Sequence, residues 1–111
     1  MNLKESIQNK LKEFILLCKT NNVKNMYAFG SAINDEFNDS TSDFDFLIEI
    51  EENDPIKKGE RLLNIWDKLE YLFQRKVDLL TNSTIKNPVL RENIEKTKIL
   101  IYDGKSQKVF I

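Results

Sequence analysis

Two aspartates that stand one residue apart carry the clearest chemical signal in the chain. Asp43 and Asp45 open the apolar alternating run 46–50, Phe-Leu-Ile-Glu-Ile. Because successive side chains of a strand point to opposite faces, both carboxylates are expected on one face of this strand. The odd-numbered residues 43–49 should form an open face, and the even-numbered residues 44–50 should face the core. Their backbones would lie roughly 6 to 7 Å apart, so the carboxylates could converge on cations held about 3.5–4 Å from each other. The pattern predicts a site for hard divalent ions, with magnesium the expected ion.

The Asp-x-Asp pattern is weak by itself, and a third aspartate strengthens it. The chain has 8 Asp among 111 residues, so chance alone supplies on the order of 0.6 such pairs. Asp78, however, stands between Val77 and Leu79 in a later apolar run. Burying an unpaired carboxylate is costly, so Asp78 needs either a cation or an open face. If its strand lies beside the first one in the sheet, the three carboxylates meet over one surface.

The dipeptide Gly30-Ser31 is a candidate phosphate-binding turn. It ends a short, half-apolar run over 23–29 and precedes Asp43 by twelve residues. Glycine lets the backbone approach a ligand closely and adopt positive φ, while the Ser hydroxyl and the following amides can donate hydrogen bonds to phosphate oxygens. Gly-Ser alone is an ordinary turn. Together with the three aspartates it predicts a polyphosphate site.

The composition excludes several other kinds of active site. The chain contains no His, which removes Ser-His-Asp triads, Cys-His dyads and imidazole-ligated metals. Cys18 is the single cysteine, so no intramolecular disulfide or thiolate cluster is expected. A net charge of −1 and a pI near 5.5 give no reason to expect direct nucleic-acid binding. Since no run reads as a secretory signal or membrane anchor, we expect a cytoplasmic protein without membrane contact.

Hydrophobic periodicity predicts the elements that would position these residues. Apolar residues recur every three or four positions in the expected helices, and two of these helices begin with the start signals Asp54-Pro55 and Asn87-Pro88. The expected strands are short apolar runs bounded by Gly, Asn or Asp. In chain order we predict a helix over 3–20, strands over 23–29 and 43–50, a helix over 55–73, a strand over 76–80, a helix over 88–95 and a strand over 98–102, with a polar loop over 34–41. At 41% hydrophobic, the chain is expected to form one domain over residues 1–111.

The order Gly30-Ser31, a loop, Asp43-x-Asp45 and a later strand with Asp78 resembles the minimal nucleotidyltransferases of the DNA polymerase β superfamily over nearly the whole chain. The resemblance implies an α/β fold: a mixed sheet of about four strands with helices on one face and the active site on the other. It further implies that Gly30 and Ser31 bind a nucleoside triphosphate and that Asp43 and Asp45 bind two Mg²⁺ ions. Asp78 would help to hold the metal that activates the attacking hydroxyl.

The chain departs from the family pattern at two points. Eleven residues separate Ser31 from Asp43, where the family usually has ten. Many members also place an Arg soon after the Gly-Ser, where this chain has Ala32, Ile33 and Asn34. The missing cation is expected to weaken triphosphate binding or to reduce activity, but its absence removes no metal ligand.

The resemblance also implies a reaction and a partner. An acceptor hydroxyl would attack the α-phosphate of ATP, and pyrophosphate would leave. Minimal proteins of this kind are commonly encoded beside a helical HEPN-domain ribonuclease toxin, so the implied acceptor is a tyrosine of such a toxin, which AMP attachment neutralises. Two other classes stay open: a small-molecule nucleotidyltransferase that modifies an aminoglycoside-like alcohol, and a non-catalytic antitoxin binding module.

Overall fold

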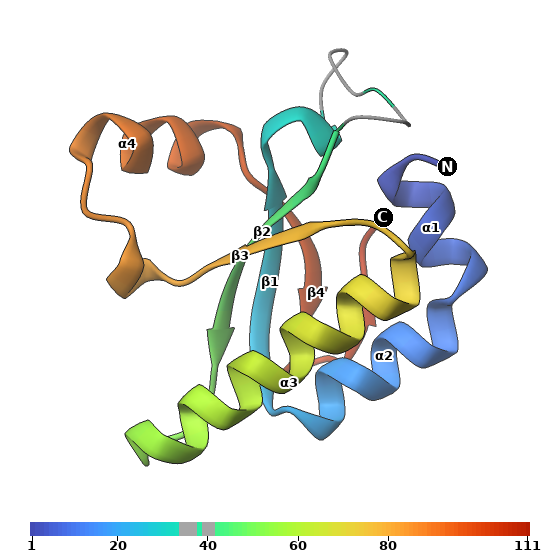
Figure 1. Cartoon of the computed structure of the whole chain (residues 1–111), viewed down its shortest axis with the longest axis horizontal. Coiled ribbons are helices and arrows are strands. Elements are labelled where there is room, and N and C mark those ends of the chain that lie inside the picture. The colour runs from blue at the N-terminus through green and yellow to red at the C-terminus, as the bar shows by residue number, and fades with distance from the viewer. Residues whose placement is uncertain (34–37, 39–41) are drawn as a thin grey trace.

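The computed structural model describes residues 1–33, 38 and 42–111 and shows helices arranged around one twisted sheet (Figure 1). Most of the predicted 34–41 loop lies outside the described residues. Within them, no helix is long and apolar enough to cross a membrane. In chain order the elements are α1 (Leu3–Asn9), α2 (Leu11–Thr20), β1 (Val23–Phe29), the 3-10 turn η1 (Gly30–Ile33), β2 (Phe44–Ile50), α3 (Pro55–Phe73), β3 (Val77–Leu80), the 3-10 turn η2 (Asn82–Thr84), α4 (Pro88–Thr97), β4 (Ile99–Asp103) and β5 (Lys108–Val109).

The sheet is mixed, with strand order β3-β2-β1-β4-β5. β2 and β3 pair in parallel and are connected through α3, whereas the pairs β1–β2, β1–β4 and β4–β5 are antiparallel. The predicted α/β fold with a mixed sheet is therefore confirmed. The two-residue strand β5 was not predicted, because a run this short has no readable alternation.

One face of the sheet holds the main core, which packs against α2 and α3. The alternate residues Phe44, Phe46 and Ile48 of β2 are buried there. Phe73 of α3 lies with its ring centroid 5.5 Å from that of Phe44 and 6.1 Å from that of Phe14 of α2. Aromatic side chains of this size dominate the apolar area that a small domain can bury. This layer fixes the orientation of β2 and therefore of the residues on its other face.

The opposite face of the sheet is partly covered by α4. A second, smaller buried cluster lies there and consists of Phe29 of β1, Leu47 of β2, Ile85 between η2 and α4, and Ile94 of α4. The sequence predicted an open face for the odd-numbered residues of β2, and Leu47 departs from that prediction because α4 folds over it. Figure 1 shows α4 apart from α1, α2 and α3. The three aspartates Asp43, Asp45 and Asp78 are only half-buried.

The first predicted helix is two helices. α1 ends at Asn9 and α2 begins at Leu11, with Lys10 at φ −125° and ψ 32° between them. Leu3, Ile7, Phe14 and Cys18 are nevertheless all buried, so the predicted apolar face is correct although the helix is interrupted. No Pro or Gly marks the break, which is why periodicity alone could not reveal it.

Gly104 closes the turn after β4 and tolerates no side chain. A Cβ atom there would collide with the backbone carbonyl of Val23 and lie 3.0 Å from that of Lys24. We expect Gly104→Ala to lower the free energy of unfolding by about 1–3 kcal/mol, because neither backbone carbonyl can move freely. Urea denaturation monitored by circular dichroism measures the effect. Gly59→Ala is the matched control: nothing lies within 4 Å of its Cβ position in α3, so this change is expected to raise stability by up to about 1 kcal/mol.

Candidate active site

Asp45 and Asp78 are neighbours across the parallel pair formed by β2 and β3. The register pairs Asp45 with Asp78, and it pairs Phe44 with Val77. Since paired residues of adjacent strands point to the same face, the two carboxylates share the face opposite the main core. Both residues are half-buried. The hypothesis that three carboxylates meet required the strand of Asp78 to lie beside the strand of Asp45. The structure meets this requirement.

Contacts from α3 and the residues after it hold β3 in this register. The indole Nε1 of Trp66 donates to the carbonyl of Val77 at 2.7 Å, and the backbone N–H of Val77 donates to Oε2 of Glu70 at 3.0 Å. Arg75 donates from Nη1 to the carbonyl of Ser42 at 2.7 Å and lies 4.8 Å over the ring of Phe44. The residues that flank Asp78 and Asp43 are therefore fixed from the helical side of the sheet.

Asp45 has an unusual electrostatic environment. The pKa of this carboxyl is raised from 3.8 to about 6, mostly by burial and further by the neighbouring charges of Asp78 and Asp43, whereas the charge of Lys76 acts in the opposite direction. Desolvation and like charges both disfavour the ionised form. A cation bound between the carboxylates would relieve this repulsion, and such perturbed groups are concentrated at functional sites.

Asp43 lies immediately before β2 and currently faces a lysine. Lys76 Nζ is 3.8 Å from Asp43 Oδ2, and the lysine side chain is 69% exposed. Within the described residues, no group of three His, Cys, Asp or Glu side chains is arranged to hold a metal ion. The donor types fit a hard divalent cation, because all three are carboxylates. The strand register pairs Asp45 with Asp78, whereas the carboxylate of Asp43 is paired with Lys76.

Gly30 lies directly against Asp45. β1 ends at Phe29, which pairs with Asp45, and Gly30 follows with φ 72° at the start of η1. A Cβ atom on Gly30 would lie 2.5 Å from Oδ2 of Asp45. Only glycine meets both demands, a left-handed φ and this close approach. The structure thus places the Gly-Ser turn beside the carboxylates, with Ser31 half-buried in η1; what these residues bind stays a prediction.

The sequence alone assigned no role to Lys76 or to Glu49. Lys76 lies immediately before β3 and opposite Asp43 on the neighbouring strand, a position that only the strand register reveals. Glu49 lies four residues after Asp45 on the same face of β2. Its Oε2 accepts a hydrogen bond from Asn25 Nδ2 at 3.3 Å, and Lys24 Nζ lies 3.8 Å from its Oε1. Glu49 is therefore engaged away from the aspartates.

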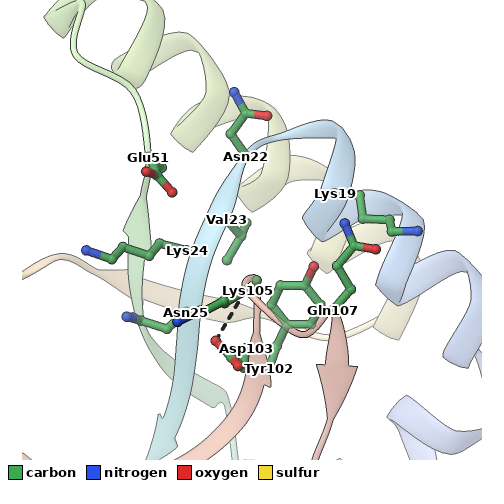
Figure 2. A pocket seen from close by; sticks show the side chains of 11 residues that line it. Lys19, Asn22, Val23, Lys24, Asn25, Glu51, Tyr102, Asp103, Lys105 and Gln107 are labelled. Carbon is green, nitrogen blue, oxygen red and sulfur yellow. Dashed lines mark hydrogen bonds between the residues drawn. The ribbon is translucent and has the colours of Figure 1, made fainter.

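A separate cleft of about 680 Å³ lies at the other end of β1 (Figure 2). Lys19, Lys24 and Lys105 line it together with Glu51 and Asp103. The carboxylate of Asp103 accepts from the backbone N–H of Lys105 and from the hydroxyl of Ser106. The cleft contains none of the predicted site residues, so the carboxylate face and not this cleft is the candidate active site.

The chain is similar over most of its length to a known protein family and to an archaeal protein. The model of the family described as "Polymerase beta, Nucleotidyltransferase" matches residues 9–107. The "Putative protein adenylyltransferase MJ0126" of Methanocaldococcus jannaschii is 34% identical over 99 residues, which cover 89% of this chain and 94% of that protein.

Solved structures are similar as well. One described as "Structure of putative minimal nucleotidyltransferase" has 26% identity and a TM-score of 0.60, covering 89% of this chain and 95% of that one. A toxin-antitoxin structure with AMP-PNP has 18% identity and a TM-score of 0.61, with coverages of 86% and 78%. A chain of the complex between a tri-AMPylated HEPN toxin of Shewanella oneidensis and an MNT antitoxin has 20% identity and a TM-score of 0.50, with coverages of 89% and 74%. The last two likenesses show a shared fold.

Proposed function

The chain belongs to the polymerase beta nucleotidyltransferase family, and from this premise we propose that it is a protein adenylyltransferase that transfers AMP from ATP to a tyrosine hydroxyl of a HEPN-type toxin and so neutralises it. The observation that carries the proposal is the strand register that pairs Asp45 with Asp78, with Gly30 packed against Asp45. A phosphate-binding turn and a negative site for cations then lie in one place. Use of ATP and such a partner implies action in the cytoplasm.

Each site residue has a role in the proposed reaction. Asp45 and Asp78 would hold Mg²⁺ together with Asp43, and two ions are expected, as the family resemblance implies. The bound metal would lower the pKa of the attacking hydroxyl and neutralise charge on the phosphoryl group. Gly30 leaves room for the triphosphate beside Asp45, and the hydroxyl of Ser31 donates a hydrogen bond to a phosphate oxygen.

The covalent step needs no enzyme-bound intermediate. The acceptor oxygen forms a bond to the α-phosphorus, the bond from that phosphorus to the bridging oxygen breaks, and pyrophosphate leaves with the electron pair. The acceptor's proton is released to solvent. With no His in the chain, the protein contributes through positioning and electrostatic stabilisation.

The relatives support the choice of nucleotide and acceptor. The archaeal relative, 94% of whose length is matched by this chain, carries the name of a protein adenylyltransferase. The similar complexes contain AMP-PNP in one case and an AMPylated HEPN toxin in another. These names describe those proteins, and they make a HEPN-type toxin the first acceptor to test here.

Transfer of label from α-labelled ATP tests the proposal. The purified protein is incubated with Mg²⁺ and a lysate that contains the product of the neighbouring gene. We expect label on one discrete protein, and loss of that label in the Asp43→Ala/Asp45→Ala double variant. Asp67→Asn, an exposed position on α3, is the matched control and should label normally.

Two outcomes would contradict the proposal. Magnesium-dependent pyrophosphate release with small alcohols, without label on protein, would identify a small-molecule nucleotidyltransferase. No transfer in either assay, with toxin neutralisation retained in the double variant, would identify a non-catalytic binding module.

A further inference from the structure

Lys76 occupies a defined place in the candidate site. The register that pairs Phe44 with Val77 and Asp45 with Asp78 also brings Lys76 opposite Asp43. Side chains two residues apart on a strand share a face, so Lys76 and Asp78 lie on the same face as Asp43 and Asp45. The four residues thus form two rows: Asp43 beside Lys76, and Asp45 beside Asp78.

The contact between Lys76 and Asp43 is suited to exchange. Its N···O distance of 3.8 Å is long for an ion pair, and the side chains of Lys76 and Asp43 are 69% and 36% exposed. Exposed pairs of this kind contribute little to stability, so the lysine can leave at small cost. While it stays, it neutralises one of the three carboxylates, and Asp43 does not join the other two in a metal-ready group.

An incoming nucleotide brings a need for a cation at this place. A triphosphate adds several negative charges beside three carboxylates, and the turn residues that follow Ser31 in the described part of η1, Ala32 and Ile33, carry no charge. Arg75 cannot serve, because its guanidinium is engaged with Ser42 and the Phe44 ring on the core side of β2. Lys76 has the required charge, length and exposure.

We propose that Lys76 is a triphosphate-binding residue that pairs with Asp43 in the nucleotide-free protein and moves to the phosphates when the metal takes Asp43. The inference rests on the proposed nucleotidyl-transfer function and adds a residue to it. The lysine thereby supplies the cation that the Gly-Ser turn of this chain lacks. It also weakens metal binding by a small factor until the nucleotide arrives, because free metal must first displace the ammonium group from Asp43.

Two binding measurements with opposite expected signs test this role. Mn²⁺ alone is titrated into the nucleotide-free protein by calorimetry, and AMP-PNP is titrated in the presence of saturating Mg²⁺. Lys76→Ala is expected to bind Mn²⁺ about 3-fold more tightly, since a weak exposed competitor is gone. The same variant is expected to bind AMP-PNP roughly 10-fold more weakly, since a charged hydrogen bond is lost. Lys76→Arg should restore nucleotide binding.

Lys24→Ala is the matched control. Lys24 Nζ lies at the same 3.8 Å from a carboxylate of β2, Glu49, but away from the aspartates, so both affinities should equal those of the wild type. Weaker binding of both ligands by Lys76→Ala would mean a merely structural lysine, and unchanged binding of both would mean an idle one; either result overturns the inference while the proposed function stands. A wild-type protein that binds neither Mn²⁺ nor AMP-PNP would overturn the proposed function and the inference with it.

Discussion

Asp45→Asn is expected to give a protein that folds more stably than the wild type and no longer transfers AMP. The substitution keeps the size of the side chain but removes the charge that Asp78 and Asp43 repel. Transfer activity should fall by about 10³-fold or more, because an amide binds hard cations poorly and the metal provides several kcal/mol of transition-state stabilisation. A loss of activity with a gain of stability separates a functional residue from a structural one.

The gain in stability has a defined pH dependence. The pKa of Asp45 rises from 3.8 to about 6 on folding, so folding favours the protonated carboxyl. This contribution to stability is fully present below about pH 3.8 and is lost as the pH rises through about 6. Above pH 7 the ionised carboxylate therefore destabilises the fold, by an amount that partial exposure reduces to about 1 kcal/mol. The melting temperature of Asp45→Asn should exceed that of the wild type by roughly 4 °C at pH 7.5.

Thermal melts at pH 4 and pH 7.5, without divalent metal, check this prediction. The difference between the two proteins should be much smaller at pH 4, where Asp45 is protonated in the folded state and partly protonated in the unfolded state. Saturating Mg²⁺ should narrow the difference at pH 7.5, because the metal stabilises only the wild type. Asp67→Asn, a substitution at an exposed position of α3, should melt like the wild type throughout. A melting temperature of Asp45→Asn below that of the wild type at pH 7.5 would show that the carboxylate makes a stabilising contact instead.

The helices and strands that position the site could be predicted from the sequence, because their signals are local. β1 runs from Val23 to Phe29, immediately before the glycine that was predicted to end it. Asp54 caps α3, which begins at Pro55, and its carboxylate accepts from the backbone N–H of Ile56 at 2.9 Å. Alternation along β2 correctly assigned Phe44, Phe46 and Ile48 to the core. Such signals depend on residues within a few positions of one another.

The relative placement of the strands could not be predicted from the sequence, because it depends on contacts between residues that are far apart in the chain. The pairing of Asp45 with Asp78 is set by the crossover through α3 and by the bonds of Trp66 and Glu70 to Val77. No pattern in residues 76–80 specifies a register. The sequence could therefore predict that the carboxylates meet only on the assumption that their strands are neighbours. For the same reason Lys76 had no assigned role, although its position two residues before Asp78 was plain.

Gly30→Ala is expected to damage the site from the other side. The new methyl group would lie 2.5 Å from Oδ2 of Asp45, and the residue would have to adopt φ 72°. The left-handed conformation costs a non-glycine residue roughly 1–2 kcal/mol, and the carboxylate must also move away. Transfer should fall by about 10²-fold, because a displacement of about 1 Å at a catalytic group has effects of that size. Unlike Asp45→Asn, this variant should also lose stability, with a melting temperature several degrees below that of the wild type.

A double-mutant cycle separates the two causes. In an Asp45→Ala background the carboxylate is absent, so Gly30→Ala should cost only the backbone strain and not the collision. The stability loss caused by Gly30→Ala should therefore be smaller in that background, and the difference is the coupling between the two positions. Gly59→Ala, with open space around its Cβ, should have the same effect in both backgrounds. An equal cost of Gly30→Ala in both backgrounds would mean that backbone conformation alone requires glycine. A smaller cost beside alanine would mean that Gly30 is needed because Asp45 has to stand where a methyl group would be, so that the turn and the carboxylate act as one site.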